Sequence, residues 1–167
     1  TTGVGHIGDT GSGGGIAALS IGGVIRHNTL VDNDGQHLTH DGGGGLLLYL
    51  TGPDLSVFGN IIAFNRESGI SCWWEGTTAA VGPNLLWENS PGDLGSGLGA
   101  CPSAWADVLL FADPLFCDPA NDDYRVASNS PALTGEEVMG AYAEPGCGPL
   151  DATPAGTWNR LRTMYRD

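Results

Sequence analysis

Pairs of asparagines five residues apart recur three times in this chain, and each pair flanks a short apolar stretch. The pairs begin at Asn28, Asn60 and Asn84, so the repeats start 32 and then 24 residues apart. Periods in this range indicate a solenoid, in which one coil stacks on the next and no coil is stable alone. The repeat therefore restricts the fold much more than it restricts the activity.

Apolar residues recur at fixed positions relative to the first asparagine of each pair. One column lies three residues before that asparagine, and a second column lies two residues after it. The members are Ile25, Val57 and Val81 in the first column, and Leu30, Ile62 and Leu86 in the second. Short aliphatic stretches between turn residues are typical of buried parallel strands. We therefore expect two strands of each coil to pass through these columns.

A glycine precedes a third strand in each coil. Gly45 and Gly69 both lie fifteen residues before the first asparagine of their coil, whereas a glycine run at residues 13–15 leaves the register of the first coil open by two residues. Alternate side chains of a strand point to the same face. The buried set predicted in this way is Leu46, Leu48 and Leu50, stacked on Ile70, Cys72 and Trp74.

Three short strands per coil predict an all-β fold, a parallel β-helix over residues 1–148 with regular coils at about 13–89 and a closing region at about 100–148. The asparagines would hold the turns, because asparagine tolerates left-handed backbone and can hydrogen-bond to the coils above and below. These structural asparagines are Asn28, Asn33, Asn60, Asn65, Asn84 and Asn89. The alternative is a β-sandwich in which the asparagine spacing is a coincidence.

Three further motifs follow the coils: residues 112–126 (ADPLFCDPANDDYRV), 130–133 (SPAL) and 139–142 (MGAY). Together with the asparagine coils, they resemble the carboxy-terminal portion of secreted bacterial right-handed parallel β-helix repeat proteins, which have a pectin-lyase-like fold. The resemblance covers about residues 13–150. It implies a right-handed solenoid whose last coils are closed by these motifs. It implies little about activity, because this group includes polysaccharide lyases, hydrolases, adhesins and other surface proteins.

Residues 149–156 (PLDATPAG) contain two prolines and a glycine, which predicts a linker. Residues 157–167 predict a short helical tail, because Thr157 suits an N-cap and Trp158, Leu161 and Tyr165 share one helical face. Three of the six arginines lie in this tail. A helix packed on the acidic solenoid is the simpler interpretation, and an attachment or sorting role is the alternative.

The four cysteines are Cys72, Cys101, Cys117 and Cys147. None of them forms a Cys-x-x-Cys pair, which argues against a structural zinc site. An even number in an acidic chain without lysine favours two disulfides and a secreted or cell-surface location. Of the three pairings that four cysteines allow, we favour Cys101–Cys117 with Cys72–Cys147. Four free, buried thiols are the alternative.

The formal net charge of −13 argues against nucleic acid and anionic membranes as partners, since both attract basic surfaces. No apolar run approaches the roughly 18 residues that predict a membrane span. The sequence starts at Thr1 without a signal peptide, so we expect a mature product or a fragment that lacks its first coils. The upstream coils of the parent chain would then be one partner, and an uncapped first coil could also support end-to-end self-association.

We identify no catalytic residues. Polysaccharide lyases on the resembling fold use an arginine or lysine base, but lysine is absent and Arg26 and Arg66 occupy different columns. Hydrolases pair carboxylates as acid and base. Asp32 and Glu88 share a column, but Phe64 occupies the coil between them. A solvated, charged edge explains these carboxylates more simply.

The loop at residues 32–41 is a candidate metal site. Laid on the EF-hand template, Asp32, Asp34 and Asp41 occupy positions 3, 5 and 12, but position 1 would be the core residue Leu30. An EF-hand is therefore excluded, and irregular Ca²⁺ binding through the three aspartates remains open. His37 and His40 are interpreted as ordinary loop histidines rather than ligands of a transition metal.

Tyr49 and Trp73 alternate with the buried positions of their strands and would stack on neighbouring coils. Exposed aromatic rings suit the apolar faces of sugars. We therefore predict a non-catalytic structural or glycan-interacting module of an exported bacterial surface protein, with polysaccharide or cell-surface glycan as the partner. One alternative is that the inserted loop at residues 32–43, or a partner, covers both rings. The other is the carboxy-terminal part of a carbohydrate-active enzyme whose catalytic coils lie upstream.

Overall fold

The computed structural model of this chain describes residues 14–35, 43–73, 77–95 and 101–152. Within them the fold is all-β, with three parallel sheets and only short 3-10 helices. The first sheet contains β1 (Ile16–Leu19), β4 (Gly43–Tyr49) and β7 (Ser68–Trp73). The second sheet contains β2 (Gly23–Arg26), β5 (Leu55–Phe58) and β8 (Ala80–Val81). The third contains β3 (Thr29–Val31), β6 (Ile61–Ala63), β9 (Leu85–Trp87) and β10 (Leu110–Phe111).

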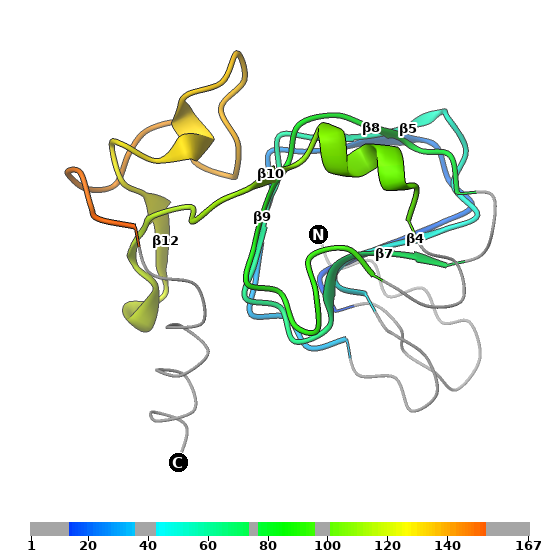
Figure 1. Cartoon of the computed structure of the whole chain (residues 1–167), viewed down its shortest axis with the longest axis horizontal. Coiled ribbons are helices and arrows are strands. Elements are labelled where there is room, and N and C mark those ends of the chain that lie inside the picture. The colour runs from blue at the N-terminus through cyan, green and yellow to red at the C-terminus, as the bar shows by residue number, and fades with distance from the viewer. Residues whose placement is uncertain (1–13, 36–42, 74–76, 96–100, 153–167) are drawn as a thin grey trace.

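The chain passes through the three sheets in turn. Strands β1 to β3 form the first coil, β4 to β6 the second and β7 to β9 the third, and each strand pairs in parallel with its counterpart in the next coil. Viewed along the stack, the coils superimpose around a common interior (Figure 1). The predicted all-β, parallel architecture is confirmed at this level, and it is compatible with a β-solenoid. The predicted helical tail lies outside the described residues.

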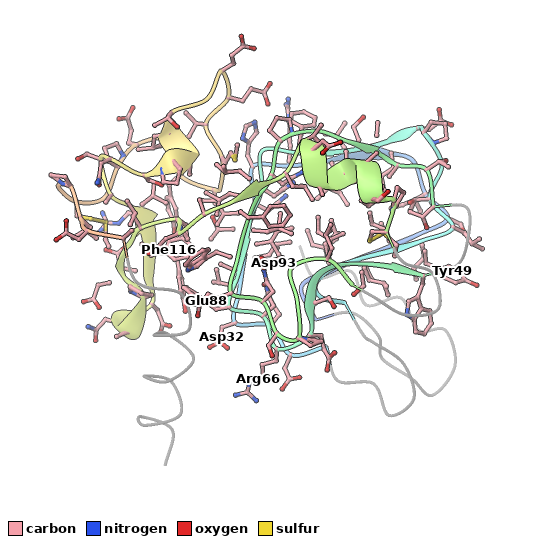
Figure 2. The ribbon with its side chains drawn as sticks, in the orientation of Figure 1. Asp32, Tyr49, Arg66, Glu88, Asp93 and Phe116 are labelled. Carbon is pink, nitrogen blue, oxygen red and sulfur yellow. A yellow bond between two sulfur atoms is a disulfide. The ribbon has the colours of Figure 1, made fainter. Side chains whose placement is uncertain are left out.

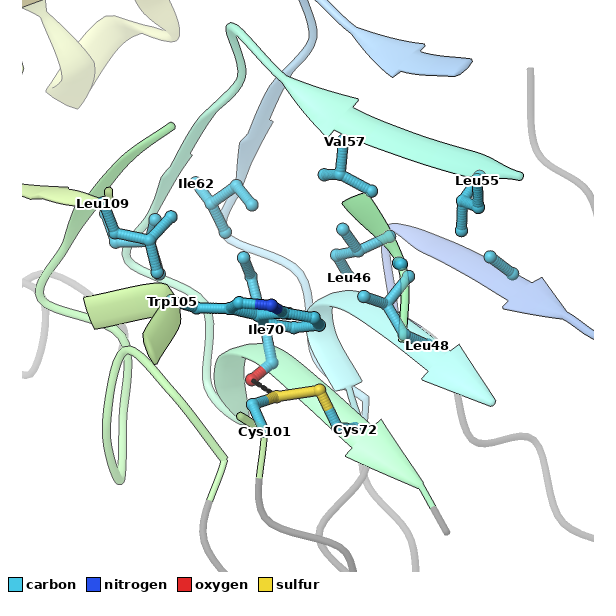
Figure 3. Packing of buried hydrophobic residues seen from close by; sticks show 13 residues of the cluster. Leu46, Leu48, Leu55, Val57, Ile62, Ile70, Cys72, Cys101, Trp105 and Leu109 are labelled. Carbon is cyan, nitrogen blue, oxygen red and sulfur yellow. Dashed lines mark hydrogen bonds between the residues drawn. A yellow bond between two sulfur atoms is a disulfide. The ribbon is translucent and has the colours of Figure 1, made fainter. Parts of the chain in front are cut away.

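The strand register confirms the apolar columns. Ile25 pairs with Val57 and Val57 with Val81, while Leu30, Ile62 and Leu86 align in the third sheet. These side chains meet inside the coils in one cluster with Leu46, Leu48 and Ile70, which Figure 3 shows from close by. Stacking apolar residues of the same kind on successive coils excludes water from a continuous interior, which supplies the main driving force for folding.

The prediction for Leu50 is wrong. Strand β4 ends at Tyr49, and Leu50 lies in left-handed backbone with φ of 49° and is 44% exposed. The alternation of faces holds only while the strand continues, so the turn directs Leu50 away from the interior. Its predicted stacking partner, Trp74, lies outside the described residues.

The glycines directly before Ile16 and Leu46 have no room for a side chain, because atoms of the neighbouring coil lie too close. A Cβ atom on Gly45 would lie 2.5 Å from the carbonyl oxygen of Gly69 and would also overlap a methyl group of Ile62. In the first coil the equivalent residue is Gly15, whose Cβ would lie 2.5 Å from the carbonyl oxygen of Gly45. The register that the sequence left open is therefore settled at Gly15.

The asparagines form two hydrogen-bonded ladders along the stack. The Oδ1 atom of Asn60 accepts from the backbone N–H and the Nδ2 of Asn28, at 3.0 and 2.8 Å. The N–H and Nδ2 of Asn60 donate in the same way to Asn84, at 3.0 and 2.8 Å. The second ladder repeats this pattern through Asn33, Asn65 and Asn89. Because most members are buried, the ladders satisfy polar groups that would otherwise destabilise the corners.

One detail of the predicted role is wrong: the left-handed residue is the one before the asparagine. His27, Asp32, Phe64 and Glu88 have φ between 48° and 58°, and Gly59 has φ of 65°. This residue turns the chain at the corner, and the asparagine that follows is then free to direct its amide at the next coil. The asparagine is selected for its hydrogen bonds rather than for its backbone conformation.

A short segment closes the carboxy-terminal end of the stack. Leu94 pairs with Ile70 in an isolated bridge, and the 3-10 helix η1 (Ser103–Asp107) then crosses the interior (Figure 1). Trp105 of this helix is buried against the core cluster and lies over its apolar side chains (Figure 3). The disulfide between Cys72 and Cys101 connects the last coil to this cap.

Two disulfides are present as predicted, but the favoured pairing is wrong. The pairs are Cys72–Cys101 and Cys117–Cys147. Cys72 and Cys101 both face the interior under the cap, whereas β10 carries the chain out along the third sheet before Cys117 is reached. Cys101 and Cys117 therefore lie in different parts of the fold, and each cysteine pairs with one in its own part.

The closing region packs against the outer face of the third sheet. It contains β11 (Phe116–Asp118), η2 (Pro119–Asn121), β12 (Asp123–Val126) and η3 (Pro131–Leu133), and β11 pairs with β12 in antiparallel orientation. Phe116, Val126 and Met139 form a second core with Ile61 and Leu85 of the sheet. The middle of the third sheet, at Ile61–Ala63, Leu85 and Leu86, is thus buried on both faces.

Residues 138–141, here termed the strap, return from the closing region to the first two coils. His27 donates from Nδ1 to the carbonyl oxygen of Val138 at 2.9 Å, and the N–H of Gly140 donates to the carbonyl oxygen of Gly59 at 2.8 Å. The N–H of Ala141 donates to Oγ1 of Thr29 at 3.0 Å. Gly140 has φ of 90°, which favours glycine at this crossing.

Candidate functional site

Tyr49 and Trp73 lie side by side at the ends of β4 and β7. They are partners in the strand register, and their ring centroids are 6.2 Å apart with an interplanar angle of 65°. Both side chains are half-buried, and they alternate with the core residues Leu48 and Cys72. Figure 2 shows Tyr49 at the outer edge of the coils. The two rings therefore meet edge to face and do not form one flat platform.

The surface around this aromatic pair is only partly open. Leu47 and Ser71 lie two residues earlier in the same strands, on the same outward face, and are 1% and 2% exposed. The outer face of the first sheet is thus covered at these positions. On β4 and β7, the outward side chains that a ligand could reach are therefore Tyr49 and Trp73 at the strand ends.

The predicted metal-binding aspartates are only partly described. Asp34 accepts a hydrogen bond from Nη1 of Arg66 at 3.1 Å, and both side chains are exposed. Arg66 therefore supplies a positive charge where a Ca²⁺ ion was predicted. Asp32 is exposed at its left-handed corner, and Asp41, His37 and His40 lie outside the described residues. In the described ranges, no group of three or more His, Cys, Asp or Glu side chains could hold a metal ion.

The carboxylates of Asp32 and Glu88 lie along one corner of the stack (Figure 2). Phe64 occupies the same corner position on the coil between them, as the left-handed residue before its asparagine. Its ring is buried and packs against Phe116 at a centroid distance of 6.0 Å. A buried aromatic side chain therefore lies between the two acidic positions.

The strongest ion pair of the described residues lies in the closing region. Arg125 donates from Nε and Nη2 to the two carboxylate oxygens of Asp123, at 2.8 and 2.6 Å. This bidentate hydrogen bond lowers the pKa of Asp123 from 3.8 to about 2 and raises the pKa of Arg125. Burial of the neighbouring Tyr124, and then the charge of Asp122, raise the pKa of the Tyr124 hydroxyl. The pair joins two residues of the same strand, β12, on the surface of the closing region.

Sequence reasoning identified the aromatic pair but missed two features. Asp93 ends one asparagine ladder, and its role was hidden because it is not an asparagine and lies four residues after Asn89. A groove over the second sheet is formed with Glu136 and Glu137, which are distant in sequence from its floor. Neither feature has a local sequence pattern that could predict it.

No helix among the described residues is long and apolar enough to cross a membrane. Comparison of the chain with protein-family models, with curated proteins and with solved structures gives no match. The resemblance to β-helix repeat proteins consequently rests on the motifs of the chain and on the observed strand order.

Proposed function

We propose that the chain is a non-catalytic module of a right-handed parallel β-helix in an exported protein, and that Tyr49 and Trp73 contact a glycan. The order of strands through three parallel sheets supports the β-helix. Parallel crossover connections are overwhelmingly right-handed, which supports the handedness. Two disulfides support a location in an oxidising compartment.

The aromatic pair is the observation that carries the glycan proposal. An edge-to-face arrangement at 65° offers the face of one ring and the edge of the other. A pyranose could place its C–H face on one ring while its hydroxyl groups remain in water. A single such contact gives a weak site, so affinity would come from repeated contacts along a polymer.

Affinity electrophoresis in gels containing soluble polysaccharides tests the proposal. A suitable panel contains β-glucan, xylan, galactan and polygalacturonate, and the variants are Trp73→Ala and Tyr49→Ala. We expect retardation of the wild type by at least one polymer, and a weakening of about tenfold in each variant, the size expected for loss of one aromatic contact.

Tyr142→Ala is the matched control, because Tyr142 is 50% exposed and lies in the closing region. It should bind like the wild type. Equal binding by wild type, Trp73→Ala and Tyr49→Ala, or no binding by any of them, would contradict the proposal. Release of unsaturated sugars by the same preparation would instead favour the carbohydrate-active enzyme.

A further inference from the structure

A groove of about 620 Å³ lies on the outer face of the second sheet, on a different sheet from the aromatic pair. Its volume falls in the range of about 300–1,000 Å³ that is usual for ligand sites. Strands β5 and β8 form its floor, and residues 135–139 of the closing region form one wall. Its lining includes Ser56, Phe58, Ala80, Glu136, Glu137 and Met139.

The floor of the groove is mainly apolar and contains one aromatic ring beside the hydroxyl-bearing strand residue Ser56. Phe58 is half-buried, and its ring meets the ring of His27 edge to face with centroids 6.2 Å apart. Ala80 and Gly82 continue the floor on the next coil, where small residues leave the space above the backbone open. Such a floor suits an alkyl chain or the plane of a guanidinium group.

The wall of the groove is acidic. Glu136 and Glu137 are both exposed, and neither forms an ion pair with another residue in the described part of the chain. The strap places them here, since the hydrogen bond from His27 to Val138 fixes the backbone directly after Glu137. Two carboxylates therefore line the groove without an ion pair to any of the described residues.

One cation lies nearby. Arg26 is the register partner of Phe58 on the first coil and is exposed, but it forms no ion pair with either glutamate. Among Arg26, Glu136 and Glu137, one guanidinium stands against two carboxylates, so these described side chains give a net negative charge. The whole chain, with a formal charge of −13, adds a field of the same sign.

We propose that this groove binds a basic peptide segment. The cationic head of an arginine or lysine side chain pairs with Glu136 and Glu137, and its alkyl stem packs on Phe58 and Ala80. Charge complementarity selects the head group, and the apolar floor selects a stem over a free inorganic cation. The extent of the groove across two coils favours a peptide over a single small amine.

Binding of an acetylated and amidated hexapeptide of alternating alanine and arginine, measured by calorimetry at low salt, tests the inference. The probes for comparison are the same peptide with citrulline in place of arginine, which removes the charge and keeps the shape, and spermidine. We expect the dissociation constant of the arginine peptide to rise about tenfold in Glu136→Gln/Glu137→Gln, since exposed pairs are each worth a few-fold. Ala80→Trp, which fills the floor without a charge change, should weaken binding by a similar factor.

The matched control is Asp107→Asn/Glu144→Gln, which removes two exposed carboxylates outside the groove lining and gives the same change in net charge. This control should change affinity less than about twofold. Equal weakening by the control would show that only the general field attracts the peptide, and would overturn the site. Equal binding of the citrulline peptide would do the same, and tighter binding of spermidine than of the peptide would overturn the assignment to a peptide.

Discussion

Asp93 accepts two hydrogen bonds from Asn89, one from its backbone N–H at 3.2 Å and one from its Nδ2 at 2.7 Å. In every earlier step of the ladder the acceptor is the Oδ1 of an asparagine on the next coil. Asp93 (labelled in Figure 2) supplies the same oxygen from a turn only four residues away. The bonds between successive members of the ladder have one direction, from the backbone N–H and Nδ2 of one residue to the side-chain oxygen of the next, so a residue whose side chain only accepts is suited to end it.

Two substitutions of Asp93 distinguish the stabilisation by its hydrogen bonds from the stabilisation by its charge. Asp93→Ala leaves the backbone N–H and one Nδ2 hydrogen of the buried Asn89 without an acceptor, while Nδ2 still donates to the carbonyl oxygen of Ile62, and should lower the free energy of unfolding by about 1–3 kcal/mol. Asp93→Asn keeps an acceptor oxygen and should cost less than about 1 kcal/mol. Urea denaturation of the two variants measures both values. Equal losses would mean that the charge of Asp93, and not its hydrogen bonds, stabilises the end of the stack.

Gly45 should not tolerate a side chain. A Cβ at this position overlaps Ile62 and approaches the Gly69 carbonyl to 2.5 Å, so the coils must separate to admit it. We expect Gly45→Ala to cost about 3 kcal/mol or more, at the upper end for overpacked sites. Gly52→Ala is the control, because a Cβ there meets nothing within 4 Å. Its melting temperature should stay close to that of the wild type, and similar losses in both variants would refute the argument from contact.

The two disulfides should differ in their effects although they close loops of nearly the same length, with separations of 29 and 30 residues. Loop entropy assigns each of them about 3.5 kcal/mol. Cys72 and Cys101 are also 5% and 8% exposed, so Cys72→Ala/Cys101→Ala loses packing under the cap as well. We expect this variant to be the less stable in guanidinium denaturation. If Cys117→Ala/Cys147→Ala is instead the less stable variant, packing under the cap does not add to the stabilisation by the first disulfide.

Acid should weaken the closing region through Asp123. Its pKa is lowered to about 2 in the folded state, so the ion pair with Arg125 stabilises the fold above the ordinary value of 3.8 and this contribution is lost as the pH falls toward 2. The difference in unfolding free energy between wild type and Asp123→Asn should therefore shrink between about pH 5 and pH 2. Asp107→Asn changes an exposed carboxylate outside this pair. If its difference from wild type shrinks equally, the effect belongs to net charge.

The coils could be predicted from the sequence because each coil repeats the same physical problem. A position such as Ile62 must be apolar in every coil, and a position such as Asn60 must be both donor and acceptor, so the pattern recurs in the letters themselves. The exposure of Leu50 could not be predicted from the repeat, because the end of its strand is set by one backbone angle. The disulfide pairing could not be predicted from the repeat either, since it depends on the route of β10 along the third sheet.

The candidate sites also divide into features that repeat from coil to coil and features that depend on the tertiary fold. Tyr49 and Trp73 could be paired in advance because they occupy one column of the repeat. The partner of Asp34 is Arg66, on the next coil. This ion pair could be predicted only if the register of the two coils on either side of the inserted loop were known. The groove could not be predicted, because Phe58 and Glu137 are brought together only by the fold of the closing region.

The strap joins residues 111 and 112 positions apart, since its contacts run from the first coil to Val138 and Ala141. In a stack held only by neighbours, the terminal coil opens first and the rest follow one by one. Here the coil formed by β1 to β3 cannot open without also breaking its hydrogen bonds to the strap. The order of synthesis then matters: residues 16–31 are made more than a hundred residues before the strap, so their contacts with it can form only after translation has passed residue 141.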